Sequence, residues 1–309
     1  MPELAEVEYF RRQWLPGLGQ PVIAIDLHPQ ARVFRGCDVE ALPRLLRKAR
    51  LLSAQAHGKQ LLFGFSGGHW LGVHLGMTGE LRTCAQDVDA GRHDHLVLRL
   101  SKLSLIFADS RLFGRVRFDP SSPSPPAWWA GLPPALLSPG FSCDWIGSHL
   151  ARRARSPIKS VLLDQSVFPG VGNWMADEIL WRLGWHPLTP AGRLDTAGIT
   201  ALRQQVRWVT RRALATIGVD WREPPASWLY RHRWAAGTRC PRNDCRAELV
   251  REHAAGRTTC WCPQCQPDPR SLDTRPPPRP VGTGHRREHP LSATGALAPT
   301  DRHSLRNPR

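Results

Sequence analysis

The chain has 309 residues, a formal net charge of +16 and an isoelectric point near 10.8. No stretch approaches the roughly 20 apolar residues of a membrane-spanning helix, and the acidic start lacks the basic and apolar regions of a secretory signal peptide. The composition therefore predicts a soluble, cytoplasmic protein with no membrane partner and with a polyanionic one, for which nucleic acid is the first candidate; a basic surface without function is the alternative.

The first eight residues place three carboxylates directly behind Pro2. If Met1 is removed, the Pro2 nitrogen becomes a free secondary amine. An α-amino group has a pKa of about 7.7–8.0, so part of it is unprotonated at neutral pH and can attack an aldehyde-like carbon to form an iminium. In the alternative interpretation, Pro2 only begins a helix whose N-terminus the acids favour. Helical spacing of apolar residues over 3–14 supports that helix, and both interpretations can hold together.

Residues 22–118 consist mainly of short runs of β-type residues separated by turn residues. Many short strands with local turns predict an antiparallel sandwich or barrel, with the opening helix lying against it. Only residues 41–49 show a helical pattern instead. The predicted strands are 22–27, 51–57, 60–65, 70–75, 95–100, 103–108 and 114–118.

Residues 119–139 contain seven prolines, which indicates a linker between domains. A helical region follows, with Asp144 and Thr196 as predicted N-caps, and helices are predicted at 144–154, 157–164, 174–183 and 196–217. From residue 266 onward the composition predicts disorder. The expected division is 1–119 for the sandwich, 120–143 for the linker, 144–234 for the helical domain, 235–266 for a zinc finger and 267–309 for a disordered tail.

Five of the eight cysteines lie between residues 240 and 265. In a cytoplasmic chain such a cluster indicates a metal site, not disulfides. The four that can supply thiolates to one tetrahedral Zn²⁺ are Cys240, Cys245, Cys262 and Cys265. A fully thiolate-ligated zinc has no open position for substrate, so its role would be structural; Cys260 is a rival ligand for Cys262. Segments 248–251 and 258–261 are expected to pair as a hairpin, with Gly256 at its turn.

A glycine-rich turn at residues 168–172 precedes a predicted helix, where backbone N–H groups can hold an anion. Lys159 and Asn173 add a cation and an amide, and the combination suits a phosphate of DNA. Arg257, near the tip of the expected hairpin, can probe a DNA groove or phosphate; a merely solvated arginine is the alternative.

Two loops at strand ends carry large side chains, namely Met77, Arg111 and Phe113. Exposed together, these side chains can wedge into a base stack and fill the space of an extruded base; core positions for Met77 and Phe113 are the alternative. Lys59 is one of only four lysines, which marks it as a candidate site for a point-like ammonium, although it can also be a simple turn residue.

These motifs, in this order, resemble the formamidopyrimidine-DNA glycosylase / endonuclease VIII family. The trio Met77, Arg111 and Phe113 favours the formamidopyrimidine branch. The matching segments, spanning residues 1 to 265, are 1–4 with 6–8, 58–59, 74–79, 111–114, 170–173 with Glu178, and 256–258.

The resemblance implies a multidomain α+β fold with an N-terminal β-sandwich and flanking helices, a helix–two-turn–helix domain and a C-terminal zinc-finger hairpin. It implies a monomeric base-excision-repair DNA glycosylase with AP lyase activity, acting on 8-oxoguanine, formamidopyrimidines or abasic sites in double-stranded DNA. In a bacterium such a protein would be associated with the nucleoid.

Carried over to this sequence, the resemblance assigns the chemistry to four residues. Pro2 would attack C1′ of the damaged nucleotide, and the resulting iminium would drive β,δ-elimination. Glu3 would be the acid/base partner and Glu6 would support the site through hydrogen bonds. Lys59 would hold a phosphate or the departing base. For DNA binding, Met77, Arg111 and Phe113 would fill the gap left by the flipped nucleotide, and Lys159, Asn173 and Arg257 would hold phosphates.

Three other functions stay open at this stage. An endonuclease VIII-like glycosylase would act on oxidised pyrimidines. A catalytically silent, zinc-dependent DNA-binding protein would hold DNA in the cleft between the lobes that the resemblance implies, but the intact Pro2, Glu3 and Lys59 argue against it. An RNA-binding zinc protein would explain the charge while leaving Pro2 and Glu3 unexplained.

Overall fold

The structure is a computed structural model that describes residues 1–28, 31–254 and 256–269. The predicted disordered tail, 267–309, lies outside the described residues from residue 270 onward. None of the helices in the described ranges is long and apolar enough to cross a membrane.

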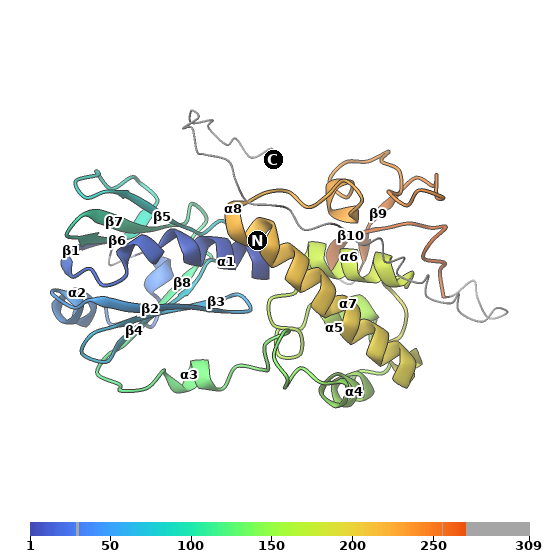
Figure 1. Cartoon of the computed structure of the whole chain (residues 1–309), viewed down its shortest axis with the longest axis horizontal. Coiled ribbons are helices and arrows are strands. Elements are labelled where there is room, and N and C mark those ends of the chain that lie inside the picture. The colour runs from blue at the N-terminus through green and yellow to red at the C-terminus, as the bar shows by residue number, and fades with distance from the viewer. Residues whose placement is uncertain (29–30, 255, 270–309) are drawn as a thin grey trace, which may run out of the picture. The chain divides into compact units, whose positions relative to one another are not determined.

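Two antiparallel four-stranded sheets form the N-terminal part (Figure 1). Their strand orders are β1-β6-β7-β5 and β2-β3-β4-β8. The strands are β1 Val22–Leu27, β2 Leu51–His57, β3 Gln60–Phe65, β4 His69–His74, β5 Glu80–Ala85, β6 Asp94–Leu100, β7 Leu103–Ala108 and β8 Arg115–Asp119. The predicted sandwich is therefore confirmed, and all seven predicted strands exist with ends within one residue of the prediction. Strand β5 was not predicted.

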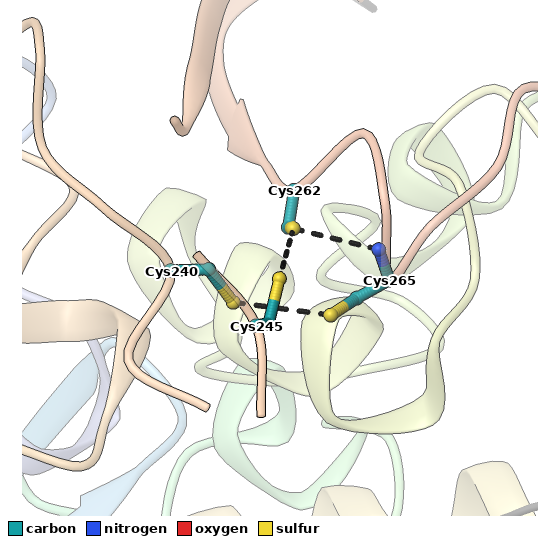
Figure 2. A group of neighbouring side chains, drawn as sticks. All are labelled: Cys240, Cys245, Cys262 and Cys265. Atoms are coloured by element: carbon teal, nitrogen blue, oxygen red, sulfur yellow. Dashed lines mark hydrogen bonds between the residues drawn. The ribbon is translucent and has the colours of Figure 1, made fainter. Parts of the chain in front are cut away.

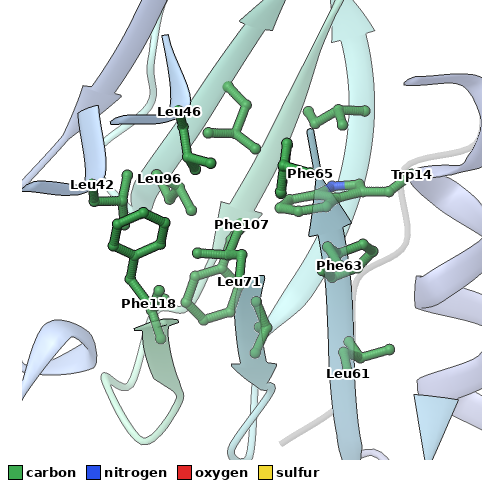
Figure 3. Close-up of a cluster of buried hydrophobic side chains, with 14 of the residues drawn as sticks. Trp14, Leu42, Leu46, Leu61, Phe63, Phe65, Leu71, Leu96, Phe107 and Phe118 are labelled. Carbon is green, nitrogen blue, oxygen red and sulfur yellow. The ribbon is translucent and has the colours of Figure 1, made fainter. Parts of the chain in front are cut away.

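The core between the sheets is built from alternate strand residues, because successive side chains point to opposite faces. Phe63 and Phe107 are fully buried there, and Trp14, which follows helix α1 (Leu4–Gln13), lies with its ring centroid 4.5 Å from that of Phe63 (Figure 3). Its indole N–H also donates to the carbonyl oxygen of Ile106 at 3.3 Å. Since full burial of one such side chain stabilises a fold by about 1.5–3 kcal/mol, Trp14 anchors the end of α1 firmly to the sandwich.

A second core lies among the helices that follow the linker. Its central helix, α6 (Asn173–Leu183), is buried on all sides from Trp174 to Trp181, and apart from Asp177 and Glu178 these residues are apolar, as expected for a fully enclosed helix. Ala5 of α1 belongs to this second core, whereas Val7 and Trp14 belong to the first. Helix α1 therefore packs against both cores and fixes the N-terminus relative to α6. The remaining helices are α2 Ala41–Leu46, α3 Ala127–Ala130, α4 Cys143–Arg152, α5 Ile158–Leu162, α6 Asn173–Leu183, α7 Thr196–Ala215 and α8 Ile217–Asp220.

The predicted N-caps of two helices were wrong by two residues and by one residue. The hydroxyl of Ser142, not Asp144, caps α4 by accepting from the backbone N–H of Trp145 at 3.0 Å. The carboxylate of Asp195, not Thr196, caps α7. In both cases a neighbouring residue with extended backbone and a short oxygen-bearing side chain takes the cap position.

The chain ends its described part with a β-hairpin, β9 Val250–Ala254 and β10 Arg257–Trp261. The predicted hairpin is confirmed, with Trp261 opposite Val250 and with Gly256 at its turn in the left-handed region, at φ +74°. Glu248, expected in the first strand, instead forms an isolated bridge with Arg239.

Candidate active site

The Glu3 carboxylate is buried at the N-terminus of helix α6. One of its oxygens accepts from the backbone N–H groups of Gly172 at 2.9 Å and Met175 at 3.1 Å, and the other accepts from Trp174 at 2.9 Å. These N–H groups have no intrahelical partners, and the helix dipole favours an anion beside them. Glu3, which precedes Gly172 by 169 residues, thus caps α6. Burial raises the pKa of its carboxyl, and Lys59 and the backbone donors oppose this effect.

Glycines make the close approach to this carboxylate possible. A Cβ at Gly172 would lie 2.3 Å from the carboxyl carbon of Glu3, and one at Gly170 would lie 2.7 Å from the Leu4 Cβ. A Cβ added at Gly58, whose φ is +59°, would lie only 2.9 Å from the backbone nitrogen of Gly170. Three sequence-distant segments therefore meet at van der Waals distance: the N-terminus, the turn that carries Lys59 and the glycine-rich turn before α6.

Glu6 lies one helical turn from Glu3 and holds it in place. Its carboxylate accepts from the backbone N–H of Glu3 at 3.2 Å, as in a capping box, and from the indole N–H of Trp174 at 2.9 Å. Burial and the nearby Glu3 charge raise the pKa of Glu6 to about 7. Two adjacent buried carboxyls that titrate unusually are typical of an acid/base site.

The terminal amine lies in the same electrostatic environment. Burial lowers the pKa of the Met1 amine; the two glutamates oppose this effect, and Lys59 and Arg111 add to it. Burial also lowers the pKa of Lys59, which the charge of Glu3 opposes. The structure thus brings Glu3, Glu6, Lys59 and the N-terminus, where Pro2 follows Met1, into one cluster.

The two loops expected to carry intercalating side chains lie together. Arg111 and Phe113 are exposed, and the Arg111 guanidinium carbon lies 5.1 Å from the centroid of the Phe113 ring. Met77, in the neighbouring loop, is half-buried. The buried carboxylate of Asp109 connects the loops, since it accepts from the Thr78 hydroxyl at 2.7 Å and from the backbone N–H of Arg111 at 3.2 Å.

Lys159 does not lie where the prediction placed it. Its side chain is 0 % exposed and pairs with Asp177 at 2.6 Å, while also donating to the Thr259 hydroxyl at 2.7 Å. Asp177 pairs in addition with the buried Arg233 at 2.7 Å. Because this ammonium is fully enclosed, the predicted phosphate contact by Lys159 is wrong for this arrangement, in which the residue fastens the hairpin to α6.

Asn173 and Arg257 lie at the edge of the contact between the hairpin and α6. The Asn173 amide donates to the carbonyl oxygen of Thr258 at 2.8 Å, and Arg257 is exposed at the start of β10. Arg257 lies close enough to Lys59 to lower its pKa. The hairpin therefore presents a cation beside the glutamate cluster.

Four cysteine side chains point toward one another beneath the hairpin (Figure 2). The sulfurs of Cys240, Cys245, Cys262 and Cys265 all lie within 4.8 Å of each other, with Cys240–Cys265 at 3.8 Å and Cys245–Cys262 at 3.6 Å. A tetrahedral zinc with Zn–S bonds of about 2.3 Å separates its sulfurs by about 3.8 Å. The four cysteines are therefore positioned to bind one metal ion.

Cys260 is not part of this group. It is buried on β10, and its backbone N–H donates to Asp177 at 3.1 Å. The rivalry between Cys260 and Cys262 is thus resolved in favour of Cys262.

Three residues of the site were missed in the sequence: Trp174, Asp109 and Asp177. Each acts through a partner far along the chain, so no local spacing marks it. The one available signal was that Asp177, with Glu178 beside it, is an acid within an otherwise apolar stretch of a predicted helix, which implies a buried partner.

Comparisons with known proteins match most of the chain. Residues 1–116 match the model of the formamidopyrimidine-DNA glycosylase N-terminal domain, and residues 132–222 match that of the formamidopyrimidine-DNA glycosylase H2TH domain. Formamidopyrimidine-DNA glycosylases of Solibacter usitatus and Thermomicrobium roseum are 30% and 34% identical, each covering 86% of this chain and 99% of the relative.

Solved structures agree with these matches. Lactococcus lactis formamidopyrimidine-DNA glycosylase bound to DNA containing an AP site has a TM-score of 0.74 at 27% identity. MutM in complex with DNA containing carbocyclic 8-oxo-G has a TM-score of 0.76 at 28% identity. Each of these two matches covers 86% of this chain and 100% of the chain in the solved structure.

Proposed function

The chain belongs to the formamidopyrimidine-DNA glycosylase family, and we propose that the cluster around Pro2 and Glu3 carries out its chemistry on damaged DNA. The protein is a DNA glycosylase of base-excision repair with DNA as its partner. The proposal adds AP lyase activity, the residues responsible and the preferred lesions. The observation that carries it is the Glu3 carboxylate, held by three backbone N–H groups beside the N-terminus.

The proposed reaction begins after Met1 is removed. The lone pair of the Pro2 nitrogen forms a bond to C1′ as Glu3, whose raised pKa favours the protonated form, gives its proton to the ring oxygen O4′ and the C1′–O4′ bond breaks. The N-glycosidic bond then breaks with its electron pair leaving on the base, which takes up the proton lost by the Pro2 nitrogen, and the iminium forms. The ionised Glu3 then takes a proton from C2′, and the electron pair of that bond expels the 3′ phosphate. Loss of a C4′ proton in a second elimination expels the 5′ phosphate.

The other residues have supporting roles in this proposal. Glu6 keeps Glu3 oriented, and Lys59 holds a phosphate or the departing base. Met77, Arg111 and Phe113 occupy the space of the extruded nucleotide, while Asn173 and Arg257 hold phosphates. The proposed domain division is that expected from the sequence: 1–119, 120–143, 144–234, 235–266 and 267–309.

Oxidised purines are the proposed lesions. Structural relatives were solved with carbocyclic 8-oxo-G DNA, with Fapy-dG DNA and also with DNA containing an oxidised pyrimidine. The intercalating trio favours 8-oxoguanine and formamidopyrimidines. An endonuclease VIII-like preference for pyrimidines would appear directly in a panel of single-lesion duplexes. The protein would act as a monomer on the nucleoid, in the bacterial cytoplasm.

The ion proposed for the four-cysteine site is one structural Zn²⁺. Four thiolates and the observed sulfur spacings suit tetrahedral zinc, and the indole N–H of Trp181 lies 3.3 Å from the Cys240 sulfur as an outer hydrogen bond to a ligand. Zinc here would hold the hairpin that carries Arg257.

Replacing a ligand should remove the metal, whereas replacing the neighbouring cysteine should not. We expect Cys262→Ser to lose bound zinc, measured as metal per purified chain, and to melt at a lower temperature, because a structural zinc contributes directly to folding. Cys260→Ser should keep a full equivalent of zinc. Equal zinc loss in the two variants would contradict the assignment of the four ligands.

The function itself is tested by borohydride trapping on a duplex that contains one 8-oxoguanine. The Met1-processed protein should form a covalent protein–DNA adduct, since borohydride reduces the iminium to a stable amine. Pro2→Gly should slow this trapping strongly. A processed wild-type protein that binds the duplex but gives neither adduct nor free base would instead be the silent DNA-binding protein.

A further inference from the structure

A groove lies on the outer face of the sheet β2-β3-β4-β8, and its position follows from strand register. Gln60, His74 and Arg115 are direct neighbours across β3, β4 and β8, so their side chains share one face. Two residues further along the strands, Gly72 lies opposite Arg117 on that same face. The side chains between them, such as those of Val73 and Val116, point to the opposite face of the sheet and belong to the core.

The floor of this groove is shaped by a glycine and a tryptophan. A Cβ at Gly72 would lie 2.6 Å from the Trp128 ring, so only glycine lets that ring settle on the sheet. Arg117 stacks on Trp128 at 4.7 Å from the ring centroid, and the indole N–H is held by Asp119 at 3.0 Å. Arg117 is thereby fixed in one orientation, as an arginine in a preformed binding site would be.

The described lining of the groove is cationic and contains no carboxylate. It includes Arg35, Arg115 and Arg117 around a cavity of ≈ 170 Å³. Arg35 is held by the carbonyl oxygen of Gly114 at 2.8 Å, and the buried Nε of Arg115 has no hydrogen-bond partner among the described residues. Burial and the neighbouring cations lower the pKa of His74 to about 4, so this histidine is neutral at physiological pH.

The groove adjoins the surface already assigned to DNA. Phe113 lines its edge, and Lys59 directly precedes Gln60 of its lining. Three arginines with free N–H groups and no carboxylate between them form a site for an oxyanion, and arginine forks match phosphate oxygens in bidentate geometry. Its volume, about five to six times the share of one water in the liquid, has room for one phosphodiester group.

We propose that this groove binds phosphate groups of the DNA backbone next to the point where Phe113 enters the duplex. The inference rests on the proposed function, because it assumes that DNA lies over the glutamate cluster. It adds Arg115 and Arg117 to the DNA contacts, neither of which belongs to the intercalating trio or to the hairpin. The contact is independent of base sequence, so it should strengthen binding to every duplex by the same amount.

The test is the salt dependence of binding of the full-length, Met1-processed protein to a duplex with one tetrahydrofuran abasic analogue. The logarithm of the binding constant falls linearly with the logarithm of salt concentration, by about 0.9 for each neutralised phosphate. The double variant Arg115→Gln/Arg117→Gln should therefore have a slope shallower by about 1.8. The variant Arg115→Lys/Arg117→Lys keeps both charges and should keep most of the slope.

A matched control makes the same charge change elsewhere. Arg44→Gln/Arg47→Gln alters two exposed arginines at helix α2, which packs on strand β1 of the other sheet, and should leave the slope unchanged. An unchanged slope in the Arg115/Arg117 glutamine variant overturns the proposal. So does an equal loss in the lysine variant, since that would mark a structural role.

Trapping separates this inference from the proposed function. Adduct formation by the wild-type protein tests the chemistry, whereas the salt slopes test only binding. If wild type itself forms no adduct, the proposed chemistry fails, while the slopes still decide whether the groove binds phosphates.

Discussion

Glu3→Gln should release the damaged base about 10²–10⁴-fold more slowly than wild type, which is the usual range for removing a general acid. The single amide oxygen of glutamine can still accept from the N–H groups of Gly172 and Met175, which share one Glu3 oxygen, so the amide can remain at the N-terminus of α6. What it cannot do is give a proton to O4′. The measurement is single-turnover release of 8-oxoguanine from a duplex, with binding to the tetrahydrofuran duplex measured in parallel and expected to survive.

Glu6→Gln is the matched control, because it makes the same replacement of a carboxyl by an amide at the adjacent buried glutamate. Its amide oxygen can still accept from the backbone N–H of Glu3 or from the indole of Trp174. We therefore expect a much smaller loss of base release than in Glu3→Gln. Rapid base release by Glu3→Gln would refute the proton-donor role; equal losses in both variants would mean that orientation, not proton transfer, limits the reaction.

Most of the fold was predictable because hydrophobic alternation and turn residues are local signals. Seven strands followed from them, and strand β5 was missed for a physical reason. It lies at the edge of its sheet, and only Leu81 among its six residues is buried, so its sequence shows little apolar alternation. The helix caps were misplaced because Ser142 and Asp144, or Asp195 and Thr196, are both acceptable cap residues, and only backbone conformation chooses between them.

The site was predictable where one segment carries a recognisable chemistry and unpredictable where distant segments meet. The cysteine spacing identified the metal-binding group, but only the structure separates Cys260 from it. Lys159 looked like a phosphate ligand in a basic chain, yet its partners Asp177 and Thr259 lie 18 and 100 residues away in sequence and enclose it completely. The anchoring of Glu3 on the glycine-rich turn was likewise invisible, although both motifs were known.

That anchoring makes Gly172 a sensitive position. Gly172→Ala should lower base release and trapping by about 100-fold, because displacing a catalytic group by about 1 Å can have that effect. The added Cβ would lie 2.3 Å from the carboxyl carbon of Glu3 and 2.5 Å from one of its oxygens, so the carboxylate must move out of the helix N-terminus. The backbone at Gly172 has φ −124°, which alanine adopts freely, so the expected loss comes from this collision and not from backbone strain.

Gly147→Ala offers the matched control. Its Cβ would meet the Ile199 side chain at an ordinary 3.4 Å, and the residue lies inside helix α4, where alanine is favoured over glycine by about 1 kcal/mol. It should melt slightly higher than wild type and keep full activity. If Gly172→Ala kept wild-type trapping, the Glu3 carboxylate would not need its three backbone donors, and the acid would have to work from a position that the structure does not show.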